Sequence, residues 1–160
     1  MSLFTKLKPH CGKSLIVGMA CGMAGFAVGV FADETKRMAI TPFQEARFVP
    51  IDPARPDGSQ IALLWGDPAK GPAATLFKSK KGAGPLHFHT SDTHVAVVQG
   101  TVKHWAEGEQ EADAKPLGAG SYWFQPGNQV HGDSCVSDEC VIFVKWEGKI
   151  DGRPPETLKK

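Results

Sequence analysis

After residue 32, apolar and polar residues alternate in short runs separated by turn-forming residues. The turns include Gly66-Asp67-Pro68 and Pro126-Gly127-Asn128. The runs are rich in β-branched and aromatic residues, which favour strands, and no window after Ala32 has helical periodicity. Short strands at regular spacing predict an all-β sandwich or barrel. The predicted strands are 61–65, 73–80, 86–89, 95–99, 101–106, 121–125, 131–135 and 141–146.

The first 32 residues have a different pattern. Lys6, Lys8 and Lys13 precede an uncharged apolar run over residues 14–31, and Ala32 is a small residue before a polar stretch. This order is typical of a secretory signal peptide, so we expect cleavage after Ala32 and a periplasmic or secreted protein. The alternative is a retained membrane anchor with the domain facing the periplasm, since the run is close to the length that spans a bilayer.

Length and composition indicate one domain. The chain has 160 residues, 41% of them hydrophobic, and a formal net charge of +1, which gives no indication of a nucleic-acid partner. We expect a signal peptide or anchor over 1–32, a lead-in with the first strand over 33–60, a β-barrel over 61–150 and a polar tail over 151–160. A membrane contact is expected only if the first segment is retained.

Histidines are the main candidates for chemistry. His87 and His89 are two positions apart, so on a strand both side chains point to the same side. Imidazole is a good ligand for zinc, copper, iron and nickel. A His-x-His pair alone is weak evidence for a metal site, because such pairs also occur on strand surfaces.

The sequence around the pair resembles a known family. Residues 82–100 resemble the first cupin motif, in which a glycine precedes His-x-His and another glycine closes the segment. Residues 120–131 resemble the second motif, with glycine, proline and histidine at the family spacing. The resemblance implies an antiparallel cupin (jelly-roll-type) β-barrel. It also implies one divalent transition metal (Fe, Mn, Zn, Cu or Ni) held by His87, His89 and His131.

The sequence departs from the first motif at its glutamate. Counting back from Gly100 gives Thr93 at that position, and counting forward from the histidine pair gives His94. If Val95 and Val97 face the core, Thr93 points inward and His94 outward, whereas a bulge would reverse this. His94 therefore stays a candidate fourth ligand. Without the glutamate, three neutral imidazoles leave the metal charge uncompensated.

Residues before the second motif's proline are candidates for the substrate pocket. Tyr122, Trp123 and Gln125 lie there, and Thr93 joins them if it points inward. The strand pattern alone does not assign which of them face inward. His104, in contrast, is interpreted as an exposed strand residue.

Cys135 and Cys140 remain if the first segment is removed. An even pair in an exported chain predicts a disulfide, here between two strands joined by a tight turn. The alternative is a redox switch or a thiol beside the metal, because Cys135 has the same strand parity as His131.

The resemblance extends to a bacterial cupin subfamily of unassigned function, so it implies the fold more than a reaction. The three-histidine site favours an oxygenase-type oxidoreductase, a dioxygenase-like cupin, acting on a small organic substrate. The alternatives are a non-catalytic periplasmic module that binds or senses a small ligand or metal, and a barrel with vestigial histidines. We expect a homodimer, because single cupin domains commonly pair through a strand edge.

Overall fold

The computed structural model describes residues 38–158, and the predicted signal segment lies outside them. Within the unit Ala39–Lys160 the described part contains strands and three short 3-10 turns. No helix among the described residues is long and apolar enough to cross a membrane. The elements are η1 (Phe43–Glu45), β1 (Val49–Pro50), β2 (Gln60–Gly66), β3 (Ala73–Ala83), β4 (Thr93–Gln99), β5 (Thr101–Ala106), η2 (Glu111–Asp113), β6 (Leu117–Gly118), β7 (Tyr122–Gln125), β8 (His131–Trp146) and η3 (Pro155–Thr157).

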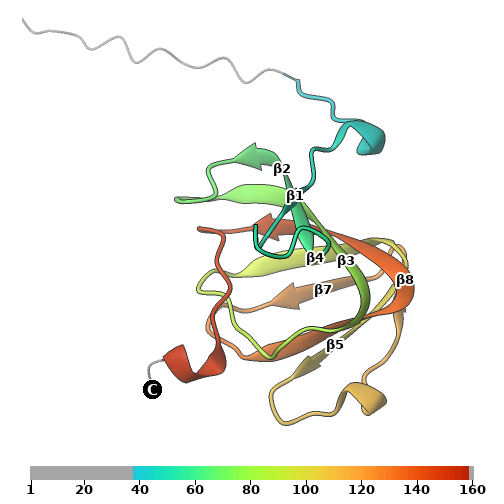
Figure 1. Cartoon of the computed structure of the whole chain (residues 1–160). Coiled ribbons are helices and arrows are strands. Elements are labelled where there is room, and N and C mark those ends of the chain that lie inside the picture. The colour runs from blue at the N-terminus through green and yellow to red at the C-terminus, as the bar shows by residue number, and fades with distance from the viewer. Residues whose placement is uncertain (1–37, 159–160) are drawn as a thin grey trace, which may run out of the picture. The chain divides into compact units, whose positions relative to one another are not determined.

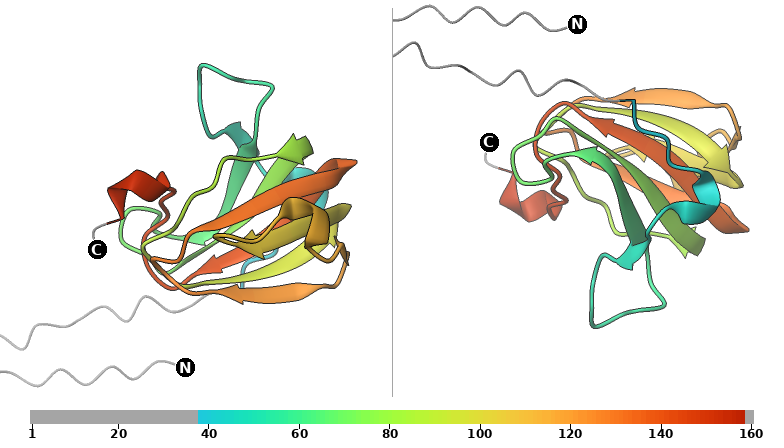
Figure 2. Two further views of the ribbon diagram at one scale, coloured as in Figure 1. Left: turned by 90° about the horizontal axis from the view of Figure 1, so that it is seen from below. Right: turned by 90° about the horizontal axis from the view of Figure 1, so that it is seen from above.

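The strands form one antiparallel sheet, which confirms the predicted fold class. Hydrogen-bonded neighbours follow the order β1-β2-β3-β8-β4-β7, while β5 pairs with β8 and β6 with β5. The sheet curls over so that its layers face each other, with β5 far from β2 (Figures 1 and 2). Between residues 38 and 158 the sheet does not close into a ring, because β7 pairs only with β4.

Strand β8 joins the two layers. Its first residues pair with β5, its last residues pair with β4, and β3 pairs with both parts. Between Lys80 and Gly82 of β3 the register shifts, because five residues of β8 (Cys135 to Glu139) lie opposite these three residues of β3. The prediction of two strands joined by a tight turn was therefore wrong. The extra residues form a bulge, and β8 continues beyond it in the same direction.

The predicted strand over 86–89 is also wrong. This segment has only two isolated bridges, between His87 and His131 and between Phe88 and Arg153. Pro85 precedes it and has no N–H to donate to a ladder. The pattern does not predict β6, which has two residues and is too short to show a period.

Alternation along β4 shows how the sequence builds the inner face. Thr93, Val95 and Val97 are buried, while the residues between them are more exposed. Such period-2 burial is expected where one face of a strand lies on the core. Val95 packs with Val144 and Trp146 on β8 inside the curled sheet. This inner face also forms the wall of the cavity described below.

A second apolar cluster lies on the opposite face of the sheet. Leu76 and Val141 form it on β3 and β8, together with Ala62 on β2. Ala46 and Phe48, which precede β1, pack against this cluster. The segment before β1 therefore covers part of the outer face and leaves the inner face to the cavity.

Candidate metal centre

The backbone places three histidines side by side. His87 and His89 lie in the connection between β3 and β4, and His131 is the first residue of β8. The His87 N–H donates to the His131 carbonyl at 3.0 Å, and the His131 N–H donates to the His87 carbonyl at 2.8 Å. Between the pair, Phe88 is 2% exposed and exchanges two backbone hydrogen bonds with Arg153. These bonds fix an irregular segment that has no ladder of its own.

The ring nitrogens have a defined arrangement. Each imidazole places Nδ1 against a backbone carbonyl oxygen, which can only accept a hydrogen bond, so Nδ1 carries the proton and Nε2 is left with a lone pair. The potential ligand atoms of the three residues lie within 4.8 Å of one another. Rings oriented in this way by an outer hydrogen bond fit a transition metal. The pairs are His87 with Pro85 (3.0 Å), His131 with Gln129 (3.0 Å) and His89 with Asp151.

Burial keeps two of these rings neutral. Burial lowers the pKa of His131 to about 4, against the smaller opposing effect of the Asp133 charge. Burial also lowers the pKa of His89, although the bond to the Asp151 carbonyl raises it in part. Both rings are therefore unprotonated near neutral pH, which is the form that binds a metal.

A carboxylate that the sequence did not predict joins the site. Asp133 Oδ2 lies 3.7 Å from His87 Nε2 and 3.8 Å from His131 Nε2. Desolvation raises the pKa of Asp133, but the hydrogen bond from His104 and the neighbouring histidines outweigh it, so the pKa is lowered. The signal was present in the spacing, because Asp133 follows His131 by two positions and shares its side of β8.

His104 contributes to the site, and its interpretation as an exposed residue was wrong. Its ring is 15% exposed, and its Nδ1 donates to Asp133 Oδ1 at 2.6 Å. Its Nε2 lies 2.9 Å from Gln125 Oε1. The Gln125 amide nitrogen donates to the carbonyls of Pro126 and Gln129, which directs the amide oxygen toward His104. The ring therefore faces an acceptor at each nitrogen.

The imidazoles border a cavity of about 340 Å³. This volume is in the range of sites for small molecules. Of the predicted pocket residues, Thr93, Trp123 and Gln125 line it. Most of the wall is apolar, formed by Phe77, Val95, Val102, Trp123, Ile142, Val144 and Trp146.

Two predicted site residues lie elsewhere. His94 is on the outer face of β4, where its Nδ1 lies 2.8 Å from the Tyr122 hydroxyl and its Nε2 lies 3.1 Å from Glu147 Oε1. Tyr122 is 59% exposed. The assignments of His94 as a ligand and Tyr122 as a pocket residue are corrected, because β4 pairs with β7 without a register shift from Thr93 to Ala96, so alternation directs these two side chains outward.

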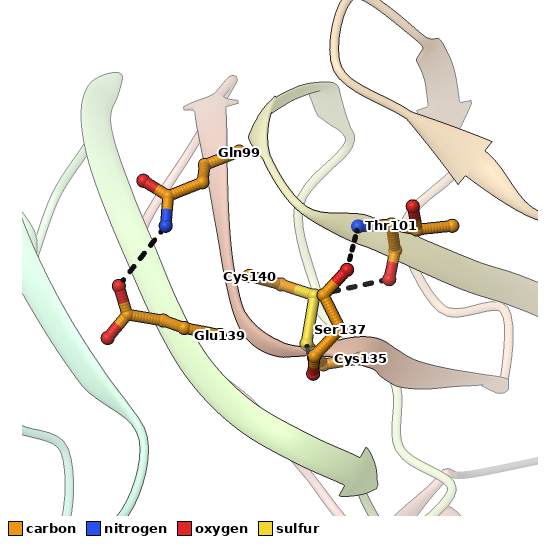
Figure 3. Close-up of a disulfide and its surroundings, with 6 residues drawn as sticks. All are labelled: Gln99, Thr101, Cys135, Ser137, Glu139 and Cys140. Carbon is orange, nitrogen blue, oxygen red and sulfur yellow. Dashed lines mark hydrogen bonds between the residues drawn. A yellow bond between two sulfur atoms is a disulfide. The ribbon is translucent and has the colours of Figure 1, made fainter.

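The predicted disulfide is present. Cys135 and Cys140 are bonded, with their Cα atoms 5.7 Å apart across the bulge of β8, as Figure 3 shows. Beside it the Thr101 N–H donates to Ser137 Oγ at 3.0 Å, which fixes the bulge against β5. Both cysteines are buried and also line the cavity.

The profile of the ChrR cupin-like domain matches residues 36–149. The chain belongs to this cupin family. A comparison with curated proteins gives no significant match. In this cupin, Thr93 lies where the first cupin motif has its glutamate, and its side chain is buried in the cavity wall.

Solved structures share the fold at low sequence identity. KdgF from a Halomonas species is similar with a TM-score of 0.56 and 20% identity, over 72% of this chain and 97% of that chain. The polyketide cyclase RemF from Streptomyces resistomycificus gives 0.57 and 18%, over 74% and 85% of the two chains. The DMSP lyase DddQ from Ruegeria pomeroyi gives 0.54 and 18%, over 76% and 62%. At such identity these likenesses show the fold alone.

Proposed function

We propose that this cupin is a metal-dependent enzyme, an oxygenase-type oxidoreductase that acts on a small organic substrate. The observation that carries the proposal is the convergence of three histidines on one wall of a mostly apolar cavity. Imidazole ligands suit iron, copper, zinc and nickel. When bound, such an ion would supply Lewis acidity and, if it is redox-active, electron transfer.

Other residues of the chain would hold the histidines in place and keep water from the substrate. The backbone carbonyls at Nδ1 hold the three imidazoles in place. Phe77, Trp123 and Ile142 form apolar walls that exclude water from the bound substrate. His104 lines the same cavity and donates a hydrogen bond to the Asp133 carboxylate.

The cavity supports a substrate of limited size. Its volume of about 340 Å³ suits a small molecule with an apolar body. Lys80 and Lys81 border the cavity, and their ammonium groups would favour a carboxylate or enolate oxygen at one end of that molecule.

The cellular setting belongs to the same proposal. We infer export to the periplasm, or attachment to the membrane on that side, from the residues before Asp33. The Cys135–Cys140 disulfide supports this, because structural disulfides persist in oxidising compartments. A homodimer is proposed as well, supported by Phe124, which is exposed on β7 at the edge of the described sheet.

Metal analysis and oxygen uptake test the function. We would measure metal content in the full chain beside a His87→Ala/His89→Ala variant, then oxygen consumption with diketones, thiols and phenols. One equivalent of metal that is lost in the variant, with metal-dependent oxygen uptake, is the expected result. Bound metal without oxygen uptake on any of these panels would contradict the oxygenase assignment.

A second candidate function rests on His104. Its hydrogen bond to Asp133 beside the cavity provides groups that can move a proton, which a non-oxidative lyase or cyclase needs. Among the similar structures, DddQ is described as a lyase and RemF as a cyclase. Conversion of a small organic substrate in the absence of oxygen would favour this lyase or cyclase function. Tightly bound zinc and no turnover would favour the non-catalytic binding module.

A further inference from the structure

The first cupin motif places its carboxylate on the strand after the histidine pair, and here Thr93 occupies that inward position. The threonine side chain is buried and carries no charge. A carboxylate nevertheless lies beside two of the three histidines, His87 and His131, and comes from β8, a different strand. We propose that Asp133 is a fourth ligand of the metal centre and replaces the missing glutamate from β8 instead of β4.

The cluster whose ligand atoms lie within 4.8 Å of one another contains the three histidines alone, and the distances from Asp133 to two of them fit direct ligation. Two ligand atoms that each lie about 2.1 Å from one ion are roughly 3–4 Å apart. Asp133 Oδ2 lies 3.7 Å from His87 Nε2 and 3.8 Å from His131 Nε2. These are the nitrogens left with lone pairs by the Nδ1 bonds to backbone carbonyls. The distances from Asp133 Oδ2 to these two nitrogens are therefore those expected between ligands of one ion.

The second oxygen of Asp133 is already occupied. Oδ1 accepts a hydrogen bond from His104 Nδ1 at 2.6 Å, and His104 in turn contacts the Gln125 amide oxygen. Ligating carboxylates in proteins are commonly held by an outer hydrogen bond of this kind. His104 is thus a positioning residue that directs Oδ2 toward the histidines.

The location of Asp133 on β8 explains how it could take the place of the missing glutamate. His131 and Asp133 are two positions apart on one strand and point to the same side. Their pairing partners on β5 are Ala106 and His104. A ligand and the residue that orients it therefore lie directly across a strand pair. Because this proposal rests on the metal site of the proposed function, the test below separates the two.

Cobalt binding to the full chain provides the test, by competition with a chelator and by visible absorption. Asp133→Asn keeps the shape and removes the charge, and Glu139→Gln is a matched loss of a carboxylate on β8 outside the cavity. Loss of a residue that only hydrogen-bonds to a metal ligand weakens metal affinity by roughly 10–100-fold. Because Asp133 is proposed to bind the metal itself, we expect Asp133→Asn to weaken cobalt affinity by about 100-fold or more. Its absorption bands should shift, and Glu139→Gln should match wild type.

Different outcomes identify different failures. If His87→Ala abolishes binding while Asp133→Asn keeps wild-type affinity and spectrum, Asp133 is not a ligand and the metal site stands. If the wild type binds no cobalt, both proposals fail. Should Asp133→Asn not fold, the infrared difference spectrum of the wild type on adding cobalt decides. A shifted carboxylate band is expected, and its absence would overturn the proposal.

His104 is tested by the same spectra. His104→Leu removes the donor to Asp133, whereas His104→Asn offers an amide N–H near the position of Nδ1. We expect the cobalt absorption bands to shift in His104→Leu and to return toward wild type in His104→Asn. Equal shifts in both variants would contradict the positioning role.

Discussion

At the scale of single residues, His131 combines deep burial with a titratable ring. Its side chain is 3% exposed, and its pKa falls from 6.5 to about 4 in the folded chain. The unfolded chain therefore takes up a proton as the pH drops through 6.5, while the folded chain does not until about pH 4. The contribution of this ring to the free energy of unfolding is therefore constant above neutral pH. It is lost as the pH falls from 6.5 to about 4.

We predict that the metal-free protein loses up to about 3 kcal/mol of unfolding free energy between pH 7 and pH 4 through this ring. Urea unfolding after chelator treatment would measure the loss. His131→Gln should flatten the profile. An equally steep profile in His131→Gln would show that other groups control it.

Single residues also show where sequence reasoning succeeded. The inward direction of Thr93 followed from strand alternation with Val95 and Val97. The contact between Asp133 and His104 did not follow, because it depends on the register between β5 and β8. That register is fixed by tertiary packing rather than by any local pattern.

At the scale of elements, a disulfide spans the bulge of β8. The bond closes a short loop, with a sequence separation of 5. We predict that Cys135→Ala/Cys140→Ala lowers the unfolding free energy by about 2 kcal/mol through the entropy of the unfolded chain. Urea unfolding with and without reductant would test this. Reductant should destabilise the wild type and leave the double variant unchanged.

The link between β4 and β5 depends on Gly100. Its φ is 80°, and a Cβ there would lie 2.5 Å from the Glu139 carbonyl oxygen. Gly108 has a similar φ of 87° with open space around it. We predict that Gly108→Ala costs roughly 1–2 kcal/mol from the backbone conformation alone. Gly100→Ala should cost more than about 2 kcal/mol, because the contact with β8 adds to the same strain.

Thermal unfolding of both variants would compare these costs. Equal losses at the two positions would mean that the chain relieves the contact at Gly100 by moving β8.

The fold itself follows from local alternation in β2, β4 and β5, where predicted and observed strands differ by at most two residues. The segment over 86–89 could not be assigned locally, because its two bridges involve His131 and Arg153, far along the chain.

At the scale of the whole molecule, the metal site connects distant parts of the chain. An ion that binds only the folded state stabilises it by about 2.7 kcal/mol when its free concentration is 100 times its Kd. We predict a rise in Tm of roughly 10 °C on adding the bound metal to chelated protein. Scanning calorimetry would measure it, and His87→Ala/His89→Ala should show no rise. A rise in that variant would indicate binding elsewhere.

Oligomeric state is the other property of the whole molecule that can be tested. Sedimentation of the full chain should give twice the monomer mass of 17.2 kDa. Phe124→Glu on the exposed edge strand should shift it toward monomer if β7 forms the contact. A monomeric wild type would contradict the homodimer.

The central position of β8 also has a consequence for biosynthesis. β3, β4 and β5 all pair with this strand, which follows them in the sequence. A ribosome therefore releases His87 and His89 long before the strand that carries His131 and closes the layers around them. A polypeptide stalled or cleaved before residue 131 has two of the three imidazoles and lacks β8, so maturation of this site can only follow synthesis of that strand.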